Sequence, residues 1–345
     1  MMLGDMGANV LKIERPTGGD ETRGWGPPFD ANGESAYYLS INRNKLGAAL
    51  DLDEPADAAL IESLLEQADV VVENFRPGVL ARRGLGADAV RARHPQVVWC
   101  TIRGFRNEPD RPGYDFVVQA ESGWMSVTGE TDGSPMKHGI ALADVLAGKD
   151  AVIAILGALV ERGRTGVGRE VIITLEGSAE ASLVNVAQNA LVSGVAPRRW
   201  GNAHANLVPY QMFEALDRAI VIAVGSDAQW LACVRALELE SLEDDVSLRS
   251  NAGRLEQRAH VVGTLRARLR ERTAVEWRTR LDAAGVPNGV VRTVPEVLAD
   301  SDASAVTGMP PSVPGALRRL PPRLGEHTAL VRARGWGAFS SEQAR

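Results

Sequence analysis

The stretch HGIALADVLAGKDAVIAILGALVERG, residues 138–163, carries a long apolar helical pattern. The pattern predicts a buried helix over 145–162, with Gly163 as its C-cap and GRTGVG as the turn into a strand, EVIITL, at 170–175. The apolar run AVIAILGALV (151–160) has about half the length that a membrane-spanning helix needs. A helix followed by a buried strand is typical of βαβ folds, so this stretch favours the α/β class.

Similar apolar runs precede this helix. NVLKIE (9–14), DVVVENF (69–75) and VVWCTIRG (97–104) are predicted as strands, and EPADAALIESLLEQA (54–68) as a helix. A further long helix is predicted at 178–193. Strands that alternate with helices indicate a parallel sheet covered on both faces. We therefore predict a Rossmann-like large domain over 1–195.

The second part of the chain has another pattern. AIVIAVGS (219–226) and VPNGVVRT (286–293) are predicted as strands, with helices at DAQWLACVRAL and AVEWRTRLDAAG. The segment before them is rich in Gly, Pro and Asn and is interpreted as a linker. We predict a linker and a smaller α+β domain over 196–300, followed by a C-terminal segment over 301–345.

Composition limits the partners of the protein. The 345 residues have a formal net charge of −6 and no block of five like charges, which argues against a nucleic-acid or anionic-membrane surface. Cys100 and Cys233 have no metal-type spacing and are interpreted as reduced thiols of a cytoplasmic protein. The start, MMLGDMGA, is no signal peptide and is typical of the last turns of a helix ending at Gly7, which predicts that residues are missing upstream.

Several motifs of common enzyme classes are absent from the sequence. It contains no G-x-x-x-x-G-K-[ST] phosphate loop, no G-x-G-x-x-G after a strand, no H-E-x-x-H and no G-x-S-x-G elbow. Nucleotide hydrolysis, zinc proteolysis and serine-esterase chemistry are therefore not favoured, and no metal site is predicted.

Asp144 stands where the apolar helix is expected to begin. It has two interpretations, because Asp is a preferred N-cap residue and because a carboxylate at a helix N-terminus stays ionised. A partly desolvated, ionised carboxylate is also a usable nucleophile toward an activated acyl carbon. The residues around Asp144 do not decide between a cap and a nucleophile.

A series of blocks gives the chain a family resemblance. In order along the chain they are LGDMGANVLKIERP, GDETRGW, NRNKLGAALDL, ADVVVENFRPGVLARRGL, RPGYDFVVQAESGWMSVTG, ALADVLAG, RWGNAHANLVPYQMFEA, AAGVPNGVV and PPRLGEHT. Together they closely resemble the class III CoA-transferases of the CaiB/BaiF type, which include formyl-CoA:oxalate and carnitine-type CoA-transferases and are related to α-methylacyl-CoA racemase. The resemblance covers nearly the whole chain.

The resemblance implies a role for Asp144, which matches the family's reactive aspartate. That aspartate attacks an acyl-CoA thioester to give an acyl–aspartyl anhydride and CoA thiolate, and the thiolate then forms an aspartyl-CoA thioester. An acceptor carboxylate regenerates an anhydride, and CoA returns to the acceptor. CoA is thus a substrate and carrier, with no prosthetic group. The family also implies an interlocked homodimer, in which the C-terminal segment returns to the large, CoA-binding domain.

Further site residues follow from the same resemblance. The expected reacting centre includes two neighbours of the nucleophile, Tyr114 and Asp115. The expected CoA-binding residues are Arg15, Asn74, Phe75, Arg82, Arg83 and Lys45. A solvated surface charge is the other interpretation of Arg82, Arg83 and Lys45.

Two other functions stay open from the sequence. The racemase branch has a His where this chain has Tyr114, and a tyrosine is a poor base near neutral pH, which favours transfer over racemisation. His138 is interpreted as a loop residue and not as a replacement base. An impaired paralogue that binds CoA is the third reading.

Three departures from the family pattern support that third reading. The chain lacks the family's initial strand and helix start, and it also lacks the Gly-rich loop that closes over the intermediate. Its C-terminal segment is shorter than usual. Trp124, where a smaller residue is common in the family, points to a tight acyl pocket. The acyl donor and the acceptor acid are not determined by the sequence.

Overall fold

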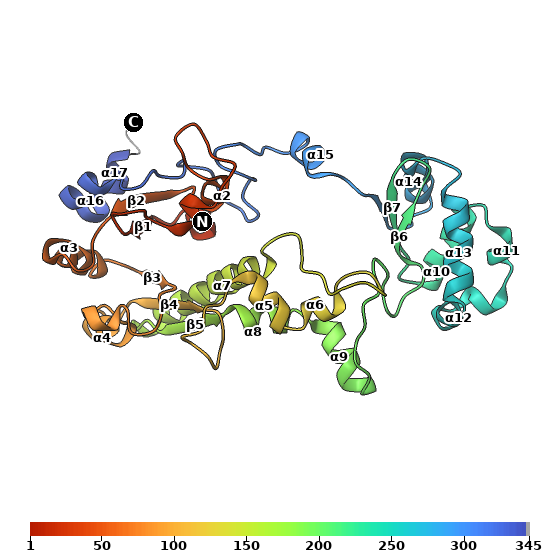
Figure 1. Cartoon of the computed structure of the whole chain (residues 1–345), viewed down its shortest axis with the longest axis horizontal. Coiled ribbons are helices and arrows are strands. Elements are labelled where there is room, and N and C mark those ends of the chain that lie inside the picture. Colours follow the sequence, from red (N-terminus) through yellow and green to blue (C-terminus); the bar gives the residue numbers. More distant parts are fainter. Residues whose placement is uncertain (343–345) are drawn as a thin grey trace. The chain divides into compact units, whose positions relative to one another are not determined.

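The computed structural model describes residues 1–342 and divides the chain into two compact units (Figure 1). Unit 1 consists of Met1–Ser122, Gly139–Leu183 and the segment from Leu298 onward. Unit 2 consists of Gly123–His138 and Val184–Val297. The chain therefore leaves unit 1 twice and returns to it twice, and unit 1 is assembled from three separate stretches.

The predicted parallel strands of unit 1 are confirmed, but they form two sheets instead of one. β1 (Val10–Glu14) pairs with β2 (Lys45–Ala49), and β3 (Val70–Glu73), β4 (Val98–Arg103) and β5 (Glu170–Thr174) form a second sheet in the order β3-β4-β5. Every pairing is parallel. In the described part of the chain, β1 and β3 each have only one strand partner, so each lies at an edge of its sheet.

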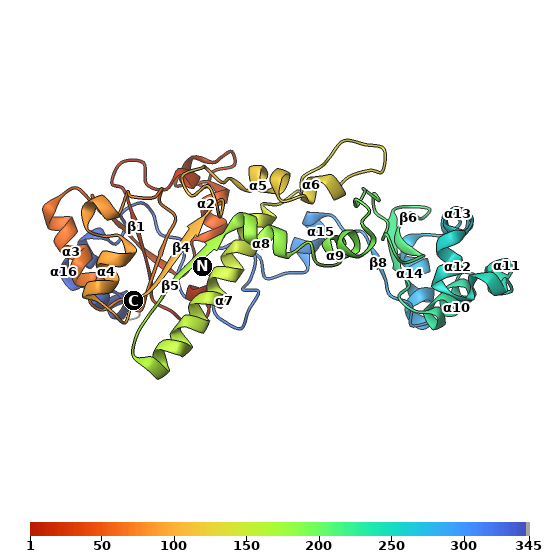
Figure 2. The same cartoon turned by 90° about the horizontal axis from the view of Figure 1, so that it is seen from below.

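Helices cover both faces of the three-stranded sheet, as expected for parallel strands. α7 (Leu142–Thr165) runs along β4 and β5 (Figure 2), where Ala151 and Ile155 pack against Cys100. On the other face, Trp99 joins an apolar cluster that also contains Leu46 of β2. The helices that contribute to this cluster are α3 (Pro55–Leu65), α4 (Ala87–Arg93), α16 (Thr328–Arg334) and α17 (Ala338–Glu342). One core thus serves both sheets.

The bounds of α7 correct the prediction at both ends. The helix begins at Leu142, so its N-cap is Ala141 and Asp144 lies in the first turn. It runs past Gly163 to Thr165, and the C-cap is Gly166, whose φ of 74° is the left-handed conformation that glycine adopts without strain. The predicted helix over 178–193 is also wrong as one piece. It is divided into α8 (Leu175–Ala181) and α9 (Val184–Ser193), because Val184 has a φ of 29° that no helix accommodates.

Buried guanidinium groups attach the C-terminal segment to the start of the chain. Arg43 forms an ion pair of 2.8 Å with Asp5 and donates a hydrogen bond of 2.8 Å to the carbonyl of Thr307. Arg23 pairs with Glu14 at 2.7 Å and donates to the carbonyl of Pro322. The hydrogen bonds to Thr307 and Pro322 join residues that are 264 and 299 positions apart. The remaining short elements of unit 1 are α1 (Met2–Asp5), η1 (Glu21–Gly24), α2 (Ala36–Ile41), η2 (Ala81–Arg83), α5 (Asp115–Glu121) and η4 (Gly335–Gly337).

Unit 2 confirms the predicted α+β pattern. β6 (Tyr210–Glu214), β7 (Ala219–Ala223) and β8 (Asn288–Val290) form an antiparallel sheet. One apolar core, centred on the fully buried Trp230 and Trp277, joins the sheet to the helices. The other elements are α6 (Trp124–Val127), α10 (Asp227–Ala236), α11 (Glu240–Glu243), η3 (Val246–Arg249), α12 (Asn251–Glu256), α13 (Arg258–Leu269) and α14 (Ala274–Ala283), with α15 (Val294–Ala299) at the return to unit 1.

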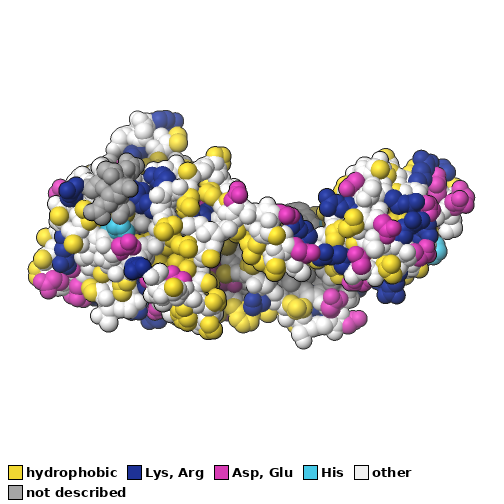
Figure 3. All heavy atoms as spheres, turned by 90° about the horizontal axis from the view of Figure 1, so that it is seen from above, with side chains coloured by type: hydrophobic (Ala, Val, Ile, Leu, Met, Phe, Trp, Pro, Cys, Tyr) yellow, Lys and Arg dark blue, Asp and Glu magenta, His cyan; other side chains and the backbone are white. Residues whose placement is uncertain are grey.

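The surface agrees with the charge pattern of the sequence. On the face shown in Figure 3, basic and acidic side chains are interspersed, and no large area carries one sign. In residues 1–342, no helix is long and apolar enough to cross a membrane.

Candidate active site

Two carboxylates of unit 1 meet at the N-terminus of α7. Asp115 accepts a hydrogen bond of 2.8 Å from the backbone N–H of Ala143, one of the N–H groups that a helix leaves without an internal partner. Its other oxygen accepts from the side-chain amide of Gln119 at 2.7 Å. Asp115 therefore performs the capping role that one interpretation of the sequence gave to Asp144. The cap interpretation of Asp144 is wrong, because the helix starts before that residue.

The Asp144 carboxylate is differently placed. Within residues 1–342, no hydrogen bond or ion pair engages it, although it lies close enough to Asp115 to feel that charge. Burial raises the pKa of Asp144 to about 6, and the negative charge of Asp115 adds to the shift. The side chain remains open to solvent on one side, so the cause is dense packing on the other side and not full enclosure. At neutral pH most of the carboxyl group is ionised.

Aromatic rings lie beside the two carboxylates. The ring centroids of Trp25 and Tyr37 are 5.0 Å apart, and those of Trp25 and Tyr114 are 6.5 Å apart. Burial raises the pKa of Tyr37, and the charges of Asp144 and Asp115 raise it further, which places its hydroxyl in their field. Tyr114, predicted at the reacting centre, is largely exposed in this cluster.

Trp25 and Tyr37 are site residues that the sequence reasoning missed. Trp25 ends one of the family blocks, GDETRGW, so a signal for it was present. Tyr37 follows Ser35, whose side chain caps α2 by accepting from the N–H of Tyr38. That cap fixes where α2 starts and therefore on which face of the helix Tyr37 lies. The sequence pattern does not show which other segments this face contacts.

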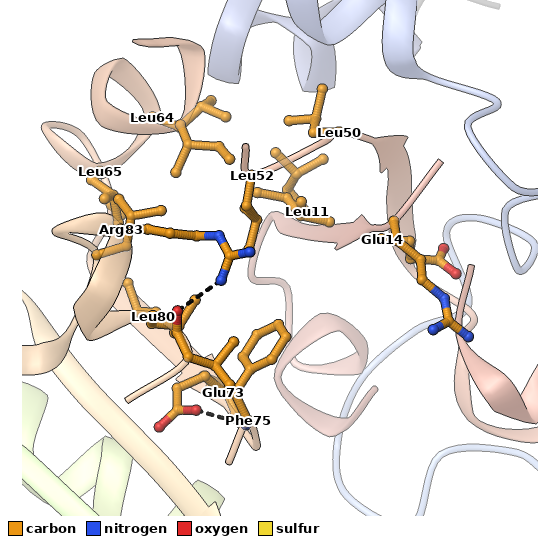
Figure 4. A pocket seen from close by; sticks show the side chains of 18 of the residues that line it. Leu11, Glu14, Leu50, Leu52, Leu64, Leu65, Glu73, Phe75, Leu80 and Arg83 are labelled. Atoms are coloured by element: carbon orange, nitrogen blue, oxygen red, sulfur yellow. Dashed lines mark hydrogen bonds between the residues drawn. The ribbon is translucent and has the colours of Figure 1, made fainter. Parts of the chain in front are cut away.

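A cavity of about 440 Å³ opens between the edges of β1 and β3 (Figure 4). Leu11 and Leu50 line one side, and Leu80 and Phe75 line the other. Arg15, directly after β1, and Arg83, in η2, also line it. The ends of parallel strands are where α/β proteins bind ligands. Three of the predicted CoA-binding residues, Arg15, Phe75 and Arg83, thus line one largely apolar cavity.

The arginines in and next to this cavity differ in whether a carboxylate already engages their guanidinium groups. Arg83 is engaged by Asp53 through two hydrogen bonds, of 2.7 and 2.6 Å, whereas Arg82 is exposed on the same turn. Arg15 donates to the carbonyl of Gly19 at 2.9 Å and is otherwise open to solvent. Because a bidentate carboxylate occupies the fork of Arg83, Arg82 and Arg15 are better placed to meet an incoming phosphate.

The other predicted CoA-binding residues are not all brought together. Asn74 is exposed directly after β3, next to Phe75. Lys45 begins β2 and is paired in register with Val10, at the opposite end of the strands from Arg15. Its ammonium group donates to Asn42 at 2.8 Å, and burial, together with Lys12, lowers its pKa to about 8. The structure therefore separates Lys45 from the other predicted CoA ligands.

His138 and Trp124 belong to unit 2. Their rings meet edge to face with centroids 5.3 Å apart, and Trp124 is buried. Among residues 1–342, no three His, Cys, Asp or Glu side chains are grouped in a way that would hold a metal ion.

Comparison with known proteins gives a consistent result. A model of CoA-transferase family III matches residues 1–315. The chain is 37% identical to a succinyl-CoA:glutarate CoA-transferase of Mus musculus, with 96% of this chain and 81% of the relative covered. It is 36% identical to a succinate–glutarate CoA-transferase of Agrobacterium fabrum, with 96% and 90% covered. A crystal structure of a CaiB/BaiF family protein from Brucella suis superposes with a TM-score of 0.83 at 36% identity, with 96% and 93% covered.

Proposed function

The chain belongs to CoA-transferase family III, and from this premise we propose that it moves CoA from an acyl-CoA to a dicarboxylic acid through covalent intermediates on Asp144. One observation carries the choice of residue. Both oxygens of Asp115 are engaged by hydrogen bonds, whereas the carboxylate of Asp144, in the first turn of α7, is unengaged among the described residues. An unengaged, partly desolvated carboxylate is the better nucleophile of the two.

The proposed reaction begins with attack of an Asp144 oxygen on the thioester carbonyl. A C–O bond forms, the C–S bond breaks, and an acyl–aspartyl anhydride and CoA thiolate result. The thiolate attacks the aspartyl carbonyl and releases the donor acid, leaving an aspartyl-CoA thioester. The acceptor carboxylate then repeats the first displacement, and the thiolate attacks the acceptor's carbonyl, which restores Asp144. Bound CoA makes each return attack effectively unimolecular.

Asp115 acts in this scheme as a positioning residue. Its bond to the Ala143 N–H fixes the first turn of α7, and with it the direction of Asp144. Its charge also keeps the pKa of Asp144 above the ordinary value of 3.8. A raised pKa increases the basicity of the ionised carboxylate, and basicity favours nucleophilic attack. Tyr114, Tyr37 and Trp25 would form the wall against which the acyl group lies.

The substrate class is inferred from relatives. The mouse and Agrobacterium proteins are named for glutarate, with succinyl-CoA or succinate as the other partner. We assign a five-carbon dicarboxylate as the acceptor. Arg15 and Phe75, which line the cavity, and Arg82, exposed on the turn next to Arg83, are the proposed CoA contacts. The two guanidinium groups would meet the phosphates and the ring of Phe75 a face of the adenine.

Assembly and location complete the proposal. Large apolar side chains stay exposed on two helices, with Ile153 and Val160 of α7 at 68% and 72% and Leu191 and Val192 of α9 at 78% and 79%. Such residues suit an interface with a second copy, so we assign a homodimer of the interlocked kind that the family resemblance implies. Cys100 and Cys233 are free, buried thiols, which suits the reducing cytoplasm.

The deciding experiment is intact-protein mass spectrometry. The full chain is mixed briefly with succinyl-CoA, quenched in acid, and compared with Asp144→Asn. The matched control is Asp150→Asn, on the same helix, whose carboxylate is already engaged by the Ser178 hydroxyl at 2.6 Å. A CoA-sized or succinyl-sized adduct on the wild type and on Asp150→Asn, absent from Asp144→Asn, is expected. An adduct that persists in Asp144→Asn would refute the assignment of the nucleophile.

A second readout separates transfer from racemisation. With glutarate present, glutaryl-CoA is expected to form, without deuterium from D₂O entering the α-position of the acyl group. Deuterium uptake without glutaryl-CoA would establish the racemase reading instead. CoA binding with neither reaction would establish the impaired paralogue.

A further inference from the structure

Two guanidinium groups of unit 2 lie on one indole ring. The Arg198 guanidinium carbon is 4.0 Å from the centroid of the Trp200 ring, and that of Arg258 is 4.7 Å from the same centroid. Both contacts are within the range of cation–π interactions. Trp200 is half-buried, Arg198 is exposed, and Arg258 is the first residue of α13. Two like charges are therefore held close together on one aromatic face or edge.

Unit 2 contains a second cluster of guanidinium groups around an indole ring. In this balanced cluster, each cation is paired with a carboxylate. Three guanidinium groups surround Trp277, at 5.5, 5.5 and 5.7 Å from its centroid. All three belong to residues that pair with one carboxylate, Glu238. These residues are Arg268, Arg272 and Arg280. Each cation of that cluster is therefore paired with a described carboxylate.

The cluster at Trp200 has no such carboxylate. Across the described residues, neither Arg198 nor Arg258 takes part in an ion pair, and the first turn of α13 contains no acidic residue. The charge of Arg198, after burial, contributes to lowering the pKa of Arg258. The Glu130 carboxylate lies against Gly201, next to Trp200, but no described acid forms an ion pair with either cation.

The cluster is also held in place. Arg258 donates hydrogen bonds of 3.1 and 2.7 Å to the carbonyls of His204 and Ala205. The residue next to Arg198, Arg199, donates to the carbonyls of Glu130 and Gly133 at 3.2 and 2.7 Å. Among the described residues, Arg198 itself makes only the ring contact, so its N–H groups are available. One anchored cation and one available cation with a shared aromatic platform are suited to an oxyanion, whose oxygens accept from guanidinium forks.

We infer that Arg198, Trp200 and Arg258 form an oxyanion-binding site on unit 2. The ligand is a phosphate or carboxylate group, and its two possible sources are the phosphates of a CoA nucleotide and a carboxylic acid. The inference rests on this cluster alone and holds whether or not Asp144 is the nucleophile.

The test is arginine labelling of the full chain with phenylglyoxal, followed by peptide mass mapping. Inorganic phosphate, 3′,5′-ADP and glutarate are added in turn, each matched in ionic strength with chloride. Protection of Arg198 is expected, with a labelling rate at least about fivefold slower at saturation, because a bound oxyanion occupies its N–H groups. Arg235, exposed and paired with Glu243 at 2.7 Å, is the internal control and should label at an unchanged rate.

Variants connect the protection to the cluster. Arg258→Gln removes the anchored cation and should abolish the protection of Arg198, while Arg280→Gln, in the balanced cluster, should leave it intact. Arg258→Lys, which keeps the charge, should retain part of the protection, which distinguishes lost charge from lost folding. Protection by 3′,5′-ADP alone assigns the nucleotide phosphates, and protection by glutarate alone assigns the acid. The absence of protection by all three anions, or protection that survives in Arg258→Gln, would overturn the inference.

Discussion

The two units are stabilised in different ways. Unit 2 has one continuous apolar core, built around Trp230 and Trp277 and drawn almost entirely from the single stretch 208–286. Unit 1 is drawn from three stretches and combines smaller apolar clusters with buried ion pairs, such as Arg43 with Asp5, that join its first and last parts. A contiguous stretch can bury its apolar faces against one another. A unit assembled from distant stretches also needs directional contacts to fix which segment docks where.

The difference extends to chemistry. Unit 1 keeps Asp144 unengaged beside an engaged Asp115, and it leaves a cavity between two sheet edges. Both features cost stability, because a partly desolvated carboxylate and an unfilled cavity are unfavourable. In unit 2 the apolar core is continuous, and three guanidinium groups that pair with Glu238 surround the buried ring of Trp277. The candidate active site thus lies in the unit that is assembled from separate stretches of the chain.

Trp277→Ala tests the unit 2 side of the comparison and has the largest expected effect. The side chain is fully buried, and its indole N–H donates to the carbonyl of Leu269 at 2.8 Å. Truncating it should cost about 4 kcal/mol of stability. In hydrogen-exchange mass spectrometry, peptides from β7 and α13 should lose protection, while peptides from β4 and α7 keep it. Equal loss in both units would show that they do not unfold separately.

Arg43→Met tests the unit 1 side of the comparison, because it removes the cation of the buried Arg43–Asp5 ion pair. It leaves the buried Asp5 carboxylate without its cation, although Asn44 still donates to it at 2.7 Å. The expected cost is about 3 kcal/mol, and loss of protection should begin in residues 305–320, where the C-terminal segment docks. Combining Arg43→Met with Asp5→Asn should recover part of the loss, because the unpaired charge is then gone. A double variant no more stable than the single one would contradict this account.

Asp115→Asn sharpens the contrast between engaged and unengaged carboxylates. The amide keeps the shape and an accepting oxygen but removes the charge, so kcat should fall by about 10- to 100-fold through poorer positioning of Asp144. The pKa of Asp144 should also move down from about 6, because the second cause of its shift is removed while burial remains. The acidic limb of the pH–rate profile should therefore move to lower pH. An unmoved limb would mean that Asp115 acts on structure alone.

Asp144→Asn should change stability only slightly. The change should be stabilising at high pH, whereas most mutations destabilise a protein. The pKa of Asp144 is raised in the folded state, so the folded state binds the proton more tightly between about pH 4 and pH 6, and stability falls as pH rises through that window. The Asn variant avoids the ionised form and should melt higher than wild type at about pH 8, with the difference vanishing below about pH 4. A lower melting temperature at high pH would contradict the burial of this carboxylate.

Much of the fold follows from local patterns. The strand at 170–174, the helices at 227–236 and 274–283, and the parallel arrangement of the first half were all predicted, because apolar periodicity is a property of neighbouring residues. The ends of α7 were misplaced by about three residues at each side. Asp144 resembled a cap in sequence, but the group that caps the helix is Asp115, which comes from another helix and is invisible to any local pattern.

The sequence by itself determined the fold class and, through its ordered blocks, predicted Asp144, Tyr114 and Asp115 as residues of the candidate site. Only the tertiary structure decided what state those residues are in. Arg83 is engaged by Asp53, whereas Arg82 is exposed to solvent. Lys45 lies at the opposite end of the β1 and β2 strands from Arg15. The rings of Trp25 and Tyr37 lie beside the carboxylates of Asp144 and Asp115. The reason is physical. Helix and strand patterns depend on contacts a few residues apart, whereas hydrogen-bond partners, burial and the field at Asp144 are set by segments that meet only after the chain has folded.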